Sequence, residues 1–114
     1  MDCTMKNKES VLKYFETFSN KNMNELEKLF SDDVVLIDWN FRSVGKEDVV
    51  KDFETIFEDV DTVQVTPIKF YSHSDNDYAV QIEILVNGQE TLEVIDTLKF
   101  NDDGLIKYIE AYKV

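Results

Sequence analysis

The sequence has little of what disulfides, metal sites and nucleic-acid interfaces require. It contains one Cys, one His and 12 Lys or Arg residues against 24 Asp or Glu residues, which gives a net charge of -12. The single Cys3 cannot form an internal disulfide, and a lone thiol fits a reducing compartment, so we expect a cytoplasmic protein. Because phosphate binding needs clustered Lys and Arg, the charge argues against a nucleic-acid partner and against an anionic membrane surface.

Long apolar runs are missing as well. No stretch approaches the roughly 18 apolar residues that a membrane span needs. The opening MDCTMKNKES lacks the apolar segment of a signal peptide, so export is not expected. One Pro and three Gly residues are scattered along the chain without forming a linker. We therefore expect one domain over residues 1–114, long enough to bury a core.

The first half of the chain predicts three helices and one strand. Segments with apolar side chains at helical spacing are 10–19, 22–30 and 46–60. Asn22 and Glu25 have the spacing of a capping box, which predicts a short second helix. Acidic residues follow Gly45 in the first turn of the third helix. Between the second and third predicted helices, DVVLIDW (33–39) is a continuous apolar run that suits a strand buried on both faces.

From Val63 onward, apolar and polar residues alternate with the period of a strand. Four strands are predicted: 63–71, 77–86, 90–100 and 105–114. Asn87-Gly88 is a strong hairpin signal, and Pro67 suits an edge strand or a bulge. The order predicts an α+β fold in which three N-terminal helices pack on a curved antiparallel sheet. So many aromatic residues around a concave sheet would leave an apolar pocket for a small ligand.

Three polar residues lie on faces that should be buried, and the first is Asp96. In LEVIDTLKF (92–100) it shares strand parity with the apolar Val94 and Leu98. It could lie at a bulge or pair with a cation. If it is buried without a cation, burial raises its pKa, and the neutral acid becomes a hydrogen-bond donor.

The other two are Asp38 and Tyr14. Asp38 follows Leu36 on one side of a strand whose two faces are both apolar, or it simply ends that strand before a turn. Tyr14 lies on the apolar stripe of the first helix, where a Tyr is usually a core residue with its hydroxyl bonded to a partner. Each residue alone has a structural explanation.

Together, the three residues resemble a known arrangement. The chain looks like a member of the nuclear transport factor 2-like (NTF2-like) superfamily, which includes SnoaL-like polyketide cyclases and ketosteroid isomerases. The markers are YFETFSNKNMNELEKLFSDDVVLID, GKEDVVKDF and DTLKFNDDGLIKYIEAY. The resemblance is closest to Δ5-3-ketosteroid isomerases at the polar positions. Their first-helix Tyr falls on Tyr14 of LKYF, their general base on Asp38 after FSDD, and their second acid on Asp96 of IDTLKF.

The resemblance implies a cystatin-like, NTF2-like cone and a proton-transfer enzyme. Asp38 would move a proton between two carbons of an enolisable carbonyl compound, and Tyr14 with a protonated Asp96 would stabilise the oxyanion. Ketosteroid isomerase is itself the known example of a carboxylic acid that is held neutral for this purpose. No cofactor and no metal are implied. We expect the pocket to be lined by Phe18, Leu36, Phe53, Phe57, Val94 and Leu98.

Departures from the family pattern leave a second function open. Trp39 stands where the isomerases have Pro after the base, and Phe53 stands where a Tyr would support the helix Tyr. The alternative is a SnoaL-like dimer that binds a small ligand without turning it over. The resemblance implies a homodimer formed through the sheet, and Glu110 either faces that interface or lines the pocket. His73 is expected to be a solvated loop residue.

Overall fold

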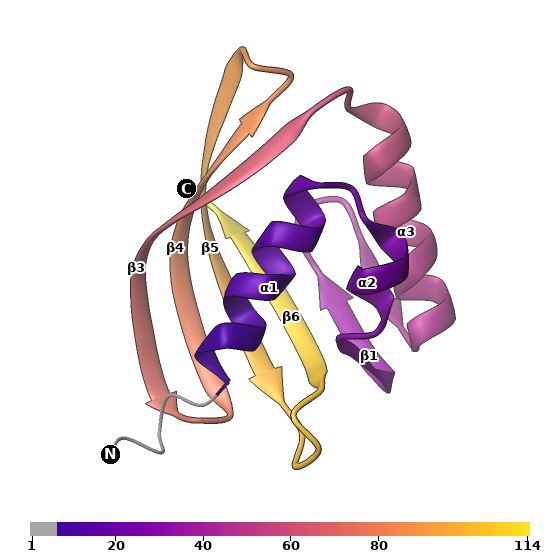
Figure 1. Cartoon of the computed structure of the whole chain (residues 1–114), viewed down its shortest axis with the longest axis vertical. Coiled ribbons are helices and arrows are strands. Elements are labelled where there is room, and N and C mark those ends of the chain that lie inside the picture. Colours follow the sequence, from indigo (N-terminus) through magenta and orange to yellow (C-terminus); the bar gives the residue numbers. More distant parts are fainter. Residues whose placement is uncertain (1–6) are drawn as a thin grey trace.

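The computed structural model describes residues 7–114, and a helical layer covers one face of a single sheet (Figure 1). The elements, in chain order, are α1 (Lys8–Ser19), α2 (Met23–Glu27), β1 (Phe30–Ile37), β2 (Arg42–Val44), α3 (Lys46–Asp59), β3 (Val63–Ser74), β4 (Asp77–Val86), β5 (Glu90–Phe100) and β6 (Ile106–Lys113). The predicted α+β class is confirmed. Within residues 7–114, no helix has the length and apolar character that crossing a membrane requires.

The sheet has six strands in the order β2-β1-β6-β5-β4-β3. All neighbouring pairs are antiparallel except β1 and β6, which are parallel. The prediction of an antiparallel sheet therefore fails at this one pair. After β1 the chain passes through α3 to the far edge of the sheet and returns by three hairpin connections, so β6 arrives beside β1 in the same direction.

The three-residue strand β2 was not predicted from the sequence. It pairs with the end of β1, with Val35 opposite Val44 and Ile37 opposite Arg42. The intervening turn is closed by a hydrogen bond from the Asp38 N–H to the Phe41 carbonyl, at 2.9 Å. A strand of this length is too short to show a period in the sequence, so its residues resembled a turn.

The local signals read from the sequence match the structure. The Asn22 side chain accepts a hydrogen bond from the Glu25 N–H at 3.3 Å and caps α2. Pro67 lies in the edge strand β3, where the register with β4 shifts. Asn87 and Gly88 both have positive φ, 55° and 67°, as the predicted tight hairpin turn requires.

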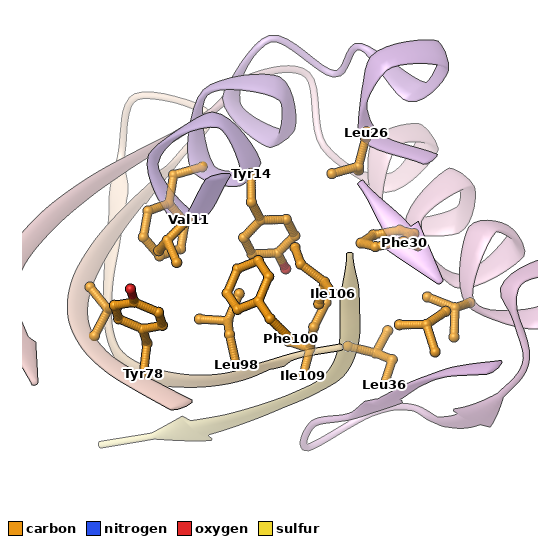
Figure 2. Close-up of a cluster of buried hydrophobic side chains, with 14 of the residues drawn as sticks. Val11, Tyr14, Leu26, Phe30, Leu36, Tyr78, Leu98, Phe100, Ile106 and Ile109 are labelled. Carbon is orange, nitrogen blue, oxygen red and sulfur yellow. The ribbon is translucent and has the colours of Figure 1, made fainter. Parts of the chain in front are cut away.

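The apolar core lies between α1 and the concave face of the sheet (Figure 2). At the N-terminal end of α1, hydrogen bonds join the start of the helix to the β3–β4 turn. The Asn7 N–H donates to Asp75 Oδ1 at 3.0 Å, and the Tyr78 hydroxyl donates to the same oxygen at 2.9 Å. This end of the cone is therefore packed and hydrogen-bonded.

Candidate functional site

A cavity of about 430 Å³ lies between the helices and the concave face of the sheet. Its walls come from α1, α3, strands β1 and β3 to β6, and the turn after β1, and they are mainly aliphatic and aromatic. Its volume falls in the range of about 300–1,000 Å³ that small-molecule sites occupy. The structure brings together most of the residues predicted from the sequence: Tyr14, Phe18, Leu36, Asp38, Phe53, Val94 and Asp96.

Two predicted lining residues, Phe57 and Leu98, are not among the side chains that line the cavity. Leu98 is fully buried opposite Tyr78 and Ile109, beyond the point where the cavity gives way to solid core. Phe57 packs its ring 5.5 Å from the ring of Phe18, centroid to centroid, and so supports a wall residue. Strand parity and helical spacing gave the correct side for both but could not locate the edge of the cavity.

Asp96 is buried in the cavity wall, with 6% of its surface exposed. It lies in regular register between Val80 of β4 and Ala111 of β6, so it occupies no bulge. No salt bridge or hydrogen bond to its carboxyl group is found in the part of the chain that the structure describes. Burial, followed by the charge of Asp38, raises the pKa of Asp96 from 3.8 to about 7.

Tyr14 is the second polar side chain of this wall, with 5% of its surface exposed. Its ring projects from α1 toward the sheet (Figure 2) and meets the Phe53 ring edge-on at 6.2 Å. Its hydroxyl makes no hydrogen bond with any residue from 7 to 114. Burial, then the charges of Asp96 and Asp38, raise the pKa of Tyr14 well above its usual value. The hydroxyl therefore stays protonated and can donate.

The free ends of Tyr14 and Asp96 reach the cavity. No side-chain nitrogen or oxygen that is wholly shielded from solvent lacks a hydrogen-bond partner among the described residues. Since neither Tyr14 nor Asp96 has a partner there, their polar atoms must contact the open space of the cavity. A ligand in that space could accept hydrogen bonds from both.

Asp38 follows the last residue of β1 and begins the turn into β2. Its Oδ1 accepts hydrogen bonds from the N–H groups of Asn40 and Phe41, both at 2.7 Å. The expectation that Asp38 ends the strand before a turn is therefore correct, and Asp38 lines the cavity as well. Its second carboxyl oxygen has no partner within residues 7–114. The carboxyl group is thus held through one oxygen and free at the other.

Some cavity residues had no signal in the sequence. Asp59 ends α3 and Glu90 begins β5, and each resembled an ordinary exposed charge. Trp39, flagged only as a departure from the family pattern, lines the cavity and remains 42% exposed. No group of three or more His, Cys, Asp or Glu residues is placed to hold a metal ion in residues 7–114.

Glu110 and His73 both lie away from the cavity. Neighbouring residues of β6, Ile109 and Ala111, line it, so Glu110 points to the outer face, where its Oε1 accepts a hydrogen bond from Tyr108 at 2.7 Å. The pocket-lining alternative for Glu110 is therefore wrong. His73 is exposed, but it belongs to the end of β3 rather than to a loop.

Comparison with known proteins places the chain in a family. The model of the SnoaL-like domain matches residues 11–109. The chain belongs to the SnoaL-like domain family. No curated protein matches the sequence at a significant level.

Solved structures share the fold at low sequence identity. An NTF2-like protein of unknown function from Cytophaga hutchinsonii is 17% identical, with a TM-score of 0.80 over 100% of this chain and 95% of that chain. A protein from Kribbella flavida, provisionally assigned as a ketosteroid isomerase, is 21% identical, with a TM-score of 0.81 over 95% and 77%. A computationally designed 17-OHP binder is 22% identical, with a TM-score of 0.78 over 90% and 86%. The predicted NTF2-like fold is confirmed.

Proposed function

We propose that this protein is a cofactor-independent isomerase of the ketosteroid isomerase type. Its substrate would be a small hydrophobic molecule with an enolisable carbonyl group. One observation carries the proposal: two buried donors without hydrogen-bond partners in residues 7–114, Tyr14 and Asp96, line the same cavity as the carboxyl group of Asp38. Buried polar groups are normally paired, so this unpaired pair suits a ligand oxygen.

The reaction would move a double bond by transferring one proton. Asp38 takes a proton from the carbon between the carbonyl group and the double bond, and the electron pair of that C–H bond moves toward the carbonyl oxygen. The oxygen becomes a dienolate oxyanion, which accepts hydrogen bonds from Tyr14 and protonated Asp96. Asp38 then returns the proton to the far carbon of the former double bond, so the enzyme ends in its starting state.

The electrostatics of the cavity suit this division of roles. Asp38 is half-buried and held through one oxygen, which leaves the other oxygen free to accept a proton. Asp96 has a pKa of about 7, so about half of the molecules carry the donor form at neutral pH. A carboxyl group whose pKa is raised by burial can stay protonated and donate a hydrogen bond to an oxyanion.

The test is isomerisation of a 3-oxo-Δ5-steroid, followed by the absorbance of the conjugated product. We expect turnover by the natural protein and its loss in Asp38→Asn, with Asp32→Asn, an exposed Asp of β1 outside the cavity, as the matched control. Tyr14→Phe should lower kcat by about 10²–10³-fold, the usual effect of losing one oxyanion donor. Turnover should also fall as the pH rises through about 7, where Asp96 loses its proton. No turnover above Asp38→Asn, on steroids or on smaller β,γ-unsaturated ketones, would refute the proposal.

The second candidate is a homodimer that binds a small ligand without turning it over. Phe53 favours it, because the side chain beside Tyr14 is a ring that cannot support the hydroxyl with a hydrogen bond. The dimer would use the outer face of the sheet, where Ile95 and Tyr112 are opposite each other and 38% and 50% exposed. Light scattering of the natural protein and of Tyr112→Glu tests the dimer. This candidate would be favoured if the natural protein and Asp38→Asn bound a ligand equally well and neither turned it over.

A further inference from the structure

The ionisable side chains of the cavity are of one sign. Asp38, Asp59, Glu90 and Asp96 line it, and no Lys, Arg or His does so in the described part of the chain. A ligand inside would therefore meet mainly apolar walls, the Tyr14 hydroxyl and carboxyl groups, with no cationic side chain among the described lining residues. The whole chain, these residues included, carries a net charge of -12.

The four carboxyl groups differ in their exposure, and Asp38 is intermediate. Asp96 is buried, whereas Asp59 and Glu90 line the cavity while remaining exposed, which places them at its opening. They come from separate elements, since Asp59 ends α3 and Glu90 begins β5. A ligand whose carbonyl group reaches the buried donors would therefore have its other end near these two residues.

Two lysines near the opening do not reverse this charge. Lys21 Nζ donates to the backbone carbonyls of Val60 and Asp61, at 2.7 and 3.3 Å, and Lys21 is not itself a lining residue. Lys113 Nζ lies 5.6 Å from the centre of the Trp39 ring and does not line the cavity either. Neither lysine forms a salt bridge with a cavity carboxylate in the described residues.

A cavity with charges of one sign and apolar walls discriminates between ligands by charge. The low-dielectric walls weaken screening, so like charges repel and opposite charges attract more strongly than in water. A ligand carboxylate near the opening would add a negative charge beside Asp59 and Glu90, whereas an ammonium group would form ion pairs with them. The acidic groups alone would not indicate a ligand. The buried donors Tyr14 and Asp96, which face the cavity and have no hydrogen-bond partner among the described residues, supply that indication.

We propose that the cavity selects apolar carbonyl compounds that carry a positive charge at the end remote from the carbonyl group, and that it binds their carboxylate counterparts more weakly. An aminoketone represents the favoured class. The inference rests on the proposed function only in taking the cavity as the site for a carbonyl ligand, and it does not require turnover.

The test uses three ligands with one body. They are 2-acetylnaphthalenes that carry, at the far ring, a propyl, a 2-aminoethyl or a 2-carboxyethyl group, and their dissociation constants are measured by fluorescence at low and high salt. These ketones lack the double bond that isomerisation needs, so the assay reports binding alone. We expect the amine to bind about tenfold or more tightly than the carboxylate at low salt, with the propyl compound between them, and the difference to shrink as salt is added.

A matched pair of variants locates the effect. Asp59→Asn/Glu90→Gln should reduce the ratio between amine and carboxylate affinities at least about threefold while leaving the propyl compound unchanged. Glu58→Gln/Glu93→Gln removes the same charge from exposed residues outside the lining and should leave the ratio unchanged.

The outcomes separate the inference from the proposed function. The inference is overturned if the carboxylate binds as tightly as the amine or more tightly. It is also overturned if the ratio of amine to carboxylate affinity falls equally in the two double variants. Failure of all three compounds to bind overturns it too, because the cavity would then not accept carbonyl ligands. The predicted order of affinities, without turnover of steroids or of smaller β,γ-unsaturated ketones, supports the inference and refutes only the isomerase proposal.

Discussion

Replacing Asp96 by asparagine should stabilise the protein, and the gain should depend on pH. An asparagine side chain has nearly the same shape as a neutral aspartic acid but cannot ionise. In the natural protein, burial and the charge of Asp38 raise the pKa of Asp96 from 3.8 to about 7. Asp96 is therefore easier to ionise in the unfolded chain than in the folded one, and each ionised Asp96 favours unfolding.

The size of the effect follows from this pKa. A tenfold change in a dissociation constant corresponds to about 1.4 kcal/mol, so a rise from 3.8 to about 7 costs the folded state about 4 kcal/mol at high pH. Below pH 3.8 both states are protonated and the cost is absent. It grows as the pH rises above that value and levels off above about 7, where the folded state ionises as well.

The assay is urea unfolding of both proteins at several pH values. Subtracting the free energy of unfolding of the natural protein from that of Asp96→Asn cancels most contributions of other titrating groups. This difference should increase by about 2.5 kcal/mol between about pH 5 and about pH 8. Asp102→Asn, in the exposed β5–β6 turn, is the control and should show a nearly constant difference.

A difference for Asp96→Asn that stays constant over this pH range would refute the reasoning. It would mean that Asp96 ionises at the same pH in the folded and unfolded protein, and hence that it is solvated or paired. The proposal that a protonated Asp96 donates to a ligand at neutral pH would then lose its support.

Three further changes test the fold by urea unfolding. Leu98→Ala should lower the free energy of unfolding by about 2–5 kcal/mol, since Leu98 is fully buried in solid core, and a loss below about 1 kcal/mol would mean that the cavity extends to it. Asn22→Ala should cost about 1 kcal/mol by removing the cap of α2, and an unchanged midpoint would contradict the capping bond. Gly88→Ala should cost about 1–2 kcal/mol because a Cβ is strained at a φ of 67°, although nothing lies within 4 Å of it.

Most elements could be predicted because their signals are local. The alternation of β5, the cap at Asn22 and the turn at Asn87-Gly88 each depend on a few neighbouring residues. The strand β2 and the parallel pairing of β1 with β6 depend instead on where distant segments meet. Neither the spacing of apolar residues nor any turn residue in the sequence indicates which distant strands pair.

The same distinction holds for the candidate site. Parity placed Asp96 on the inner face, because its apolar neighbours Val94 and Leu98 must be buried together. Parity could not indicate that Val94 borders the cavity while Leu98 lies in solid core. The charges at the opening, Asp59 and Glu90, resemble any exposed acid at the end of an element, and only the three-dimensional structure brings them to one cavity.

The cost of burying Asp96 bears directly on whether the cavity holds a ligand. About 4 kcal/mol is a large part of the roughly 5–15 kcal/mol by which a domain of this size is usually stable. No protein group in residues 7–114 offsets it, because neither Asp96 nor the Tyr14 hydroxyl has a hydrogen-bond partner there. A carbonyl oxygen in the cavity would accept from both and favour the protonated acid. The arrangement that lowers the stability of the folded protein is therefore the one that a carbonyl ligand would stabilise.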